Sequence, residues 1–166
     1  MATASDLPRI RPLVAGDAPG CDAVIASLPY HFGNEDGRRE CAEAVRGGAG
    51  LVAVQGDRVV GFLTVVHHFA ETSEITWMAV HADRRGQGIG RALIQRLTGE
   101  LQGQGRRLLL VVTVSSLEEE PGVEDGYRRT RAFYRSVGFV PARELPDLWP
   151  GDKALLLAMP LGQELG

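Results

Sequence analysis

Hydrophobic positions follow two periods along the chain, and the changes between them predict the order of helices and strands. Arg9–Val14 is expected to form a short strand, and Asp17 is suited to cap an apolar-periodic helix that runs to about Leu28. A second helix is predicted over Arg38–Arg46, between the turn-forming stretch Tyr30–Asp36 and a glycine-rich break. The N-terminal third therefore has the order strand, helix, helix.

The middle of the chain changes from a hairpin pattern to a strand–helix–strand pattern. Leu51–Gln55 and Arg58–His67 are β-rich runs on either side of a Gly-Asp turn, which predicts an antiparallel hairpin. A strand over Glu74–Val80, a helix over Gly90–Gln102 and a strand over Arg107–Val114 then predict a βαβ unit. The last of these strands is apolar almost throughout, which is typical of a strand covered by helices on both faces.

The last third begins with an acidic loop, Ser115–Gly126, which contains no basic residue. A helix over about Tyr127–Ser136 is expected to follow and to end before a glycine. The tail is predicted to form a β pair, Phe139–Pro141 and Ala154–Met159, with a loop containing Pro and Gly between them. Since no internal repeat or linker is present, residues 1–166 are expected to form one domain.

Composition favours an ordinary soluble domain and disfavours several classes of function. The 166 residues are 44% hydrophobic and 23% charged, enough for one globular core. The net charge of −3 disfavours a protein that binds nucleic acid mainly by neutralising phosphates. The longest apolar run is far below the ~20 residues of a membrane helix, and the N-terminus lacks the apolar stretch of a secretory signal. We therefore expect a cytoplasmic protein with no membrane partner.

Cys21 and Cys41 have neither Cys-x-x-Cys spacing nor a histidine at metal-ligand spacing. We therefore expect reduced, partly buried thiols and no metal. Neither cysteine has an evident base that would activate it as a nucleophile.

The chemically informative segment is a glycine-rich turn where a predicted strand meets a predicted helix. Glycine lets the backbone approach a ligand, and the free N–H groups at a helix start favour an anion such as a pyrophosphate. Arginines on both sides would add charge-assisted contacts. The residues of this turn are Arg85, Gly86, Gln87, Gly88, Ile89, Gly90 and Arg91.

Three phosphate-binding motifs compete for this turn, and residue spacing separates them. A P-loop requires Gly-Lys-Ser/Thr, whereas this chain has Gly90, Arg91 and Ala92. The Gly-x-Gly-x-x-Gly of a dinucleotide-binding oxidoreductase fails because the third glycine comes one position early. The third motif, Arg/Gln-x-x-Gly-x-Gly/Ala, fits the run Arg85–Gly90.

On this motif the chain resembles the GCN5-related N-acetyltransferase (GNAT) superfamily, whose signature lies between a strand and a helix. Glu74–Val80 is similar to the family's fourth strand, and Ala132–Phe139 is similar to its fourth helix and the turn that follows. The resemblance is specific from about Leu51 to Met159. It implies that residues 1–166 form a single GNAT-like acyl-CoA N-acyltransferase domain.

The resemblance also implies a fold and a coenzyme site. The fold is α/β (α+β), with a mixed, mostly antiparallel central sheet splayed between strands 4 and 5 and helices on both faces. Acetyl-CoA would lie in the opening as co-substrate, its pantetheine arm pairing with the fourth strand and its pyrophosphate on the glycine turn. An Asn that the family often has after the fifth strand is absent, and Ser115 or its neighbour is the expected replacement. The implied coenzyme-binding residues are Met78, Ala79, Val80, Arg85, Gly86, Gln87, Gly88, Ile89, Gly90 and Arg91.

Acetyl transfer from a thioester to an amine needs one group that takes a proton from the amine and another that protonates the departing thiolate. Tyr134 occupies the position of the family's general-acid tyrosine. The alternative is a structural tyrosine packed beside Phe133 and Phe139, its hydroxyl merely hydrogen-bonded.

Glu74 is the candidate base, acting directly or through water, because it begins the central strand where several GNAT enzymes carry a catalytic glutamate. The alternatives are an anchor for the substrate's ammonium group or a solvated carboxylate. His67 and His68 are rival bases, since an ordinary imidazole titrates near neutral pH. The simpler interpretation of the histidines is a surface pair at the end of a strand.

The acceptor is predicted as a primary amine on a small molecule or a peptide, with no nucleic acid as partner. The acidic run Glu118–Asp125 would attract a cationic substrate if it is not simply a solvated loop. Trp77 and Trp149 are candidates for lining the acceptor site, with core or lid packing as the alternative. A homodimer is common in the family. The alternative function is a non-catalytic acetyl-CoA-binding regulatory module.

Overall fold

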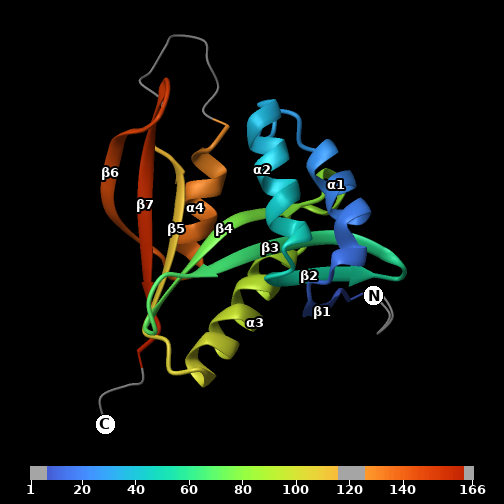
Figure 1. Ribbon diagram of the computed structural model, residues 1–166, viewed down its shortest axis with the longest axis horizontal. Coiled ribbons are helices and arrows are strands. Elements are labelled where there is room, and N and C mark those ends of the chain that lie inside the picture. The colour runs from blue at the N-terminus through green and yellow to red at the C-terminus, as the bar shows by residue number, and fades with distance from the viewer. Residues whose placement is uncertain (1–6, 116–125, 163–166) are drawn as a thin grey trace. The chain divides into compact units, whose positions relative to one another are not determined.

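The computed structural model describes residues 7–115 and 126–162. It divides into two compact units. The first unit comprises the described residues up to Val66 together with Thr76–Glu100, and the second comprises His67–Ile75 and the described residues from Leu101 onward. The elements in chain order (Figure 1) are β1 (Arg9–Pro12), the 3-10 turn η1 (Ala15–Asp17), α1 (Ala18–Ala26), α2 (Glu35–Arg46), β2 (Gly50–Gln55), β3 (Arg58–His67), β4 (Thr72–Val80), the 3-10 turn η2 (Ala82–Arg84), α3 (Ile89–Gly103), β5 (Leu108–Val114), α4 (Arg128–Ser136), β6 (Val140–Trp149) and β7 (Asp152–Pro160).

In the first unit, helices cover both faces of the β1–β2–β3 meander, whose strands are antiparallel. Residues of α1 and α2 pack with Val52, Val54 and Phe62 of the strands in one buried cluster. On the opposite face Gly61 lies against Ile89 and Leu93 of α3, and Figure 1 shows α3 on the other side of these strands from α1 and α2. The absence of a side chain at Gly61 therefore allows α3 to approach β3 closely.

In the second unit, β5 pairs with β4 in parallel and with β7 antiparallel, and β6 pairs with β7. The β5–β7 register runs without interruption from Leu108↔Pro160 to Val114↔Ala154. α4 is joined to the end of β5, since the Arg131 guanidinium donates to the Val114 and Ser115 carbonyls at 3.1 Å. These contacts fix the helix that carries Tyr134.

The strand order β1-β2-β3-β4-β5-β7-β6 confirms the predicted mixed, mostly antiparallel sheet with its βαβ crossover. β4 and β5 pair from Thr72↔Leu108 to Ile75↔Val111, yet β4 continues to Val80 and β5 to Val114. Hydrogen-bonded pairing between β4 and β5 therefore covers only the first part of each strand. None of the helices in the described part is long and apolar enough to span a bilayer.

Three local predictions were wrong. α2 begins at Glu35, a turn earlier than predicted, because the Asn34 side chain accepts from the Asp36 N–H and caps the helix. Asp17 makes no side-chain cap at the start of α1, since its carboxylate is held by Arg11 and the Val14 N–H. The segment expected to be a Pro/Gly loop belongs largely to β6, whose register shifts accommodate its prolines at the edge of the sheet.

Gly20 marks the tightest contact between α1 and the sheet. A Cβ placed there would lie 2.7 Å from Val59 Cγ2 and 2.8 Å from Val59 Cβ, and a valine Cβ cannot move without its backbone. Gly99 in α3 has open space around the same position.

We predict opposite effects for alanine at these two helical glycines. Gly99→Ala should raise the free energy of unfolding by about 0.5–1 kcal/mol, because alanine favours helix. Gly20→Ala should lower it by about 1–3 kcal/mol, because the overpacked contact outweighs the propensity gain. Urea unfolding measures both, and a Gly20→Ala variant as stable as Gly99→Ala would contradict the close approach of α1 to β3.

Candidate active site

The glycine turn has the backbone that a phosphate cradle requires. Gly86 and Gly88 have φ angles of +76° and +80°, in the left-handed region that side chains disfavour. A Cβ at either position would meet no heavy atom within 4 Å, so the space beside the turn is open. At this end of α3 the Ala92 N–H donates to the Gly88 carbonyl at 3.0 Å. Helix geometry leaves the N–H groups of Ile89 and Gly90, in the first turn, without an acceptor inside the helix, which suits an anion.

The arginines near this turn differ in their contacts. Arg84 donates to Gln55 Oε1 at 3.0 Å, and Asp83 is paired with Arg58 at 3.2 Å. The exposed Arg85 makes no hydrogen bond or ion pair with another residue in the described ranges. Of these side chains, Arg85 is therefore the one whose charge is left for an incoming anion.

The second half of β4 has an edge without strand pairing. The β4–β5 register ends at Ile75, so Met78, Ala79 and Val80 have no ladder partner on that edge within the described residues. Ala79 is buried and packs in the cluster below α1 and α2. A strand edge of this kind offers backbone groups to an extended ligand.

Glu74 lies in the first half of β4, opposite Leu110 of β5 in the parallel ladder. Its Oε2 lies 2.5 Å from His68 Nε2, and its side chain is 23% exposed. His67 instead places Nδ1 2.8 Å from the hydroxyl of the buried Ser73. Burial, together with the charge of Arg106, lowers the pKa of His67. The two histidines are therefore engaged with different partners.

Tyr134 is buried in α4 and packs against two aromatic rings, those of Phe133 and Phe139, each with its centroid 5.4 Å away. Its hydroxyl makes no hydrogen bond to another described residue. Burial raises the pKa of Tyr134 above its ordinary value, so the phenol stays protonated. A protonated donor in an apolar setting suits a general acid, although the same packing fits the structural alternative.

The remaining candidate residues, Trp77, Trp149 and Ser115, have structural contacts or surface positions. Trp77 packs against the core of the first unit, and Trp149 lies at the exposed end of β6. The Ser115 hydroxyl donates to Glu144 Oε1 at 2.5 Å, so the serine expected to replace the family's Asn already has a carboxylate partner. Ser116 and the acidic run from Glu118 lie outside the described residues.

Cys21 and Cys41 are fully buried free thiols, and burial raises the pKa of each to about 12. At neutral pH both are uncharged, which makes them poor nucleophiles. Among the described residues no cluster of His, Cys, Asp and Glu side chains is arranged to hold a metal ion.

Comparison with protein families decides the classification. Residues 46–141, more than half of the chain, match the family model described as an acetyltransferase (GNAT) domain. The chain belongs to the GNAT acetyltransferase family. The fold class and the family inferred from the glycine turn are thus confirmed, while the roles of individual residues stay predictions. A search of the curated proteins found no match.

Solved structures share the fold at low sequence identity. A GNAT-family protein from Desulfovibrio desulfuricans has a TM-score of 0.79 at 23% identity, over 93% of this chain and 99% of that chain. The ribosomal-protein-S18-alanine N-acetyltransferase from Escherichia coli has a TM-score of 0.73 at 20% identity, covering 96% and 99%. An aminoglycoside 6'-N-acetyltransferase complexed with coenzyme A has a TM-score of 0.72 at 17% identity, covering 95% and 99%.

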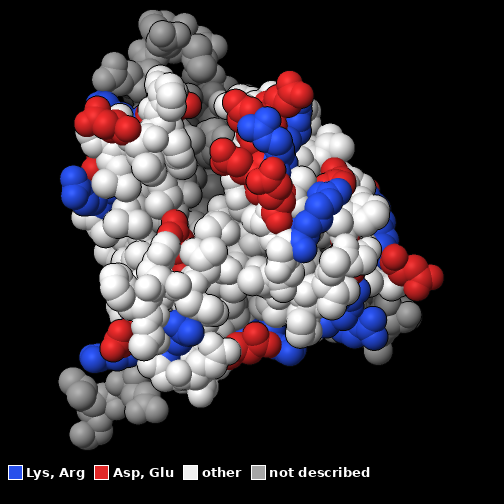
Figure 2. All heavy atoms as spheres, viewed as in Figure 1, with Lys and Arg blue, Asp and Glu red and all other residues white. Residues whose placement is uncertain are grey.

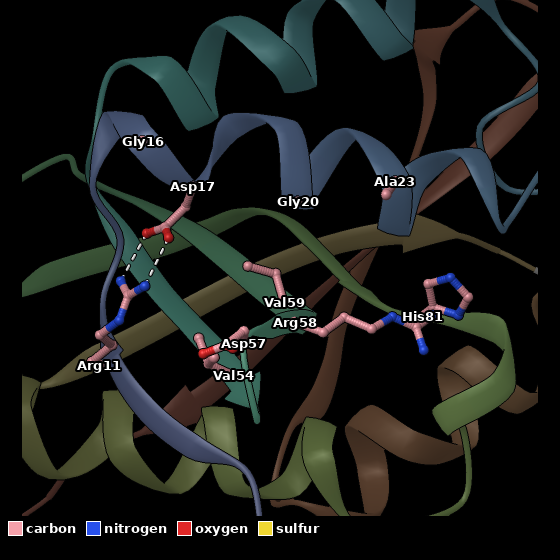
Figure 3. A pocket seen from close by; sticks show the side chains of 10 residues that line it. All are labelled: Arg11, Gly16, Asp17, Gly20, Ala23, Val54, Asp57, Arg58, Val59 and His81. Carbon is pink, nitrogen blue, oxygen red and sulfur yellow. Dashed lines mark hydrogen bonds and ion pairs between the residues drawn. The ribbon is translucent and has the colours of Figure 1, made fainter.

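The surface of this GNAT protein also has a separate hollow of about 380 Å³ in the first unit, lined by α1, β1 and the β2–β3 turn. Figure 3 shows Arg11 and Asp17 bonded to each other at one side of it, with Nη1 and Nη2 of the guanidinium each 2.8 Å from a carboxylate oxygen. Arg58 is likewise engaged by Asp83. Since its arginines are already neutralised, the hollow has little to attract an anion, and we assign it no ligand.

The Arg11–Asp17 pair in this hollow predicts a pH-dependent stability. The Arg11 hydrogen bonds and the Val14 N–H hold the pKa of the mostly buried Asp17 below its usual value. A depressed pKa contributes stability above about pH 4, and this contribution is lost as the pH falls through the folded-state value.

Asp17→Asn should therefore lower the free energy of unfolding by about 1–2 kcal/mol at pH 7, because it leaves Arg11 without its charged partner. The difference in the free energy of unfolding between the variant and the wild type should become smaller below about pH 4. Urea unfolding at pH 7 and pH 3.5 compares the two proteins, and a gap that is independent of pH would contradict the ion pair.

Proposed function

We propose that this GNAT protein transfers an acetyl group from acetyl-CoA to a primary amine by direct attack in a ternary complex. The observation that carries the proposal is the glycine turn at the start of α3, with left-handed Gly86 and Gly88 and open space beside both. The family match supports the acetyltransferase class. The coenzyme A complex of a structural neighbour supports the choice of donor.

In this proposal the glycine turn and the second half of β4 each bind a different part of the coenzyme. The amides of Gly86–Gly90 and the side chain of Arg85 hold the pyrophosphate, since the two left-handed glycines open the turn to a ligand and Arg85 is exposed beside it. Backbone groups of Met78–Val80 pair with the pantetheine arm, because their edge of β4 lacks a strand. Neither task needs a metal ion.

The chemistry requires one proton to leave the amine and one to reach the sulfur. Glu74 takes the proton from the amine, directly or through water, as nitrogen bonds to the acetyl carbon. The carbon–sulfur bond then breaks, and Tyr134 donates its hydroxyl proton to the thiolate to give free coenzyme A. Since burial raises the pKa of Tyr134, this tyrosine arrives protonated for that step.

The acceptor follows less directly from the residues. The structural neighbours include enzymes named for a ribosomal protein's alanine and for aminoglycosides, so both peptide amino ends and amino sugars belong in a substrate panel. Acidic and basic side chains are mixed over α2 (Figure 2), including the ion pair between Arg39 and Asp36. This mixture favours neither a cationic nor an anionic acceptor.

Gly88→Ala is predicted to weaken acetyl-CoA binding by about tenfold, because alanine disfavours the left-handed conformation that aims the amides at the pyrophosphate. Gly48, at φ +79° with open space around it, is the matched control, since it lies after α2. Both alanine variants should lose similar stability, about 1 kcal/mol. Only Gly88→Ala should change the affinity measured by calorimetry, and equal affinities in the two variants would contradict the cradle.

Release of free coenzyme A thiol, followed with polyamines, aminoglycosides, amino acids and peptides, tests the reaction itself. With an accepted amine, Glu74→Gln should lower kcat by about 10²-fold and Tyr134→Phe by a similar factor, because each removes a proton-transfer group. The exposed Glu71 provides a control carboxylate three residues away, and Glu71→Gln should keep the wild-type rate. Acetyl-CoA binding without release to any acceptor would favour the regulatory module.

A further inference from the structure

Two neighbouring histidines, His67 and His68, follow one another at the end of β3 yet are engaged in opposite ways. His67 is held through Nδ1 by the buried Ser73 hydroxyl, whereas His68 is held through Nε2 by Glu74 Oε2. The side chain of His68 is 44% exposed and that of Glu74 is 23% exposed. The two histidines therefore cannot be treated as equivalent rival bases.

The contact with His68 engages only one of the two oxygens of Glu74. An ionised carboxylate only accepts hydrogen bonds, so a Glu74 that is ready to act as a base receives the Nε2–H of His68 at Oε2. Its Oε1 makes no hydrogen bond within the described residues. One oxygen is thus fixed and the other is left for a proton from the acceptor or from water.

The backbone that presents this pair is itself held on several sides. The His68 N–H donates to the Thr72 carbonyl at 3.0 Å, which closes the turn between β3 and β4. Arg106 donates to the Phe69 carbonyl at 2.8 Å and to the Ala70 carbonyl at 3.3 Å. Glu74 is in turn fixed by its place opposite Leu110. A side-chain contact across such a turn is held in place at little further cost in entropy.

We propose that His68 is a positioning residue for the reaction: it holds Oε2 of Glu74 so that Oε1 is presented to the proton that must leave the amine. The proposal rests on the proposed function, because it assumes that Glu74 is the base. It also gives a reason for the contact between His68 and the Glu74 carboxylate, while His67 is bound to Ser73. His68 itself forms no bond with the substrate and takes no proton in the reaction.

The kinetic test compares three variants at saturating amine. His68→Ala should lower kcat by about tenfold, since a misplaced catalytic group costs a factor of this order, and should leave KM for acetyl-CoA within about twofold. His68→Gln, whose amide N–H can replace Nε2–H, should recover most of kcat. His67→Asn, whose amide can replace the Nδ1 contact with Ser73, is the matched control and should keep the wild-type kcat.

A second measurement follows the contact without activity. In the imidazole ¹⁵N spectrum of the full chain, Glu74→Ala should shift the Nε2 resonance of His68 and leave the resonances of His67 in place. Unshifted His68 resonances would overturn the proposal. An active wild type whose His68→Ala variant keeps full kcat, while Glu74→Gln is impaired, would also overturn it. A wild type that transfers no acetyl group would instead contradict the proposed function, so the two failures are distinguishable.

Discussion

β4 has hydrogen-bonded strand pairing with β5 along only part of its length, and the two halves of the strand consequently differ in what they can do. Up to Ile75 it pairs in parallel with β5, so the backbone of Glu74 is fixed. From Thr76 to Val80 that edge has no strand partner within the described residues. Buried or half-buried backbone groups are costly to leave unpaired, so such an edge needs water or an extended ligand. The residues proposed to bind the cofactor and the residue proposed as the base thus lie on consecutive stretches of one strand.

The glycine turn follows the second half of β4. Like that strand edge, it has backbone groups suited to a ligand. Two glycines in the left-handed region cost conformational entropy on folding, and Gly88, directly before α3, has no side chain that could cap the helix. Both features lower the stability of the protein when no anion is bound at the turn. Each becomes favourable when an anion occupies the turn, because the amides then gain acceptors and the absent side chains leave room for it.

Local signals made much of this predictable. The glycine turn, the βαβ unit and the helix of Tyr134 depend on residues close together in sequence, and all three lie where they were expected. The start of α2 was misplaced because a single side-chain bond from Asn34 decided it. Most of β6 was missed because its prolines resemble a loop, whereas the pairing with β7 comes from residues distant in sequence. The bounds of an element were mispredicted where its contacts outweighed the local sequence preference.

The His68–Glu74 contact shows the same limit within the candidate site. The histidine doublet and the glutamate were both identified, but as competitors, because sequence spacing alone does not show that side chains six residues apart are in contact. A tight turn after β3 brings them together, and the alternation of side chains along a strand then sends His67 to Ser73 and His68 to Glu74.

The environments of Tyr134 and Glu74 support the different roles proposed for them. Tyr134 packs between two aromatic rings, and the burial that raises its pKa keeps it protonated, as a group that is to donate a proton must be. Glu74 is partly exposed and has a histidine on one oxygen, so its other oxygen can accept a proton without the loss of an existing contact. An apolar pocket favours the neutral acid and a polar, solvated one favours the ionised base. The assignment of acid and base therefore depends on where the two side chains are embedded, rather than on their residue types alone.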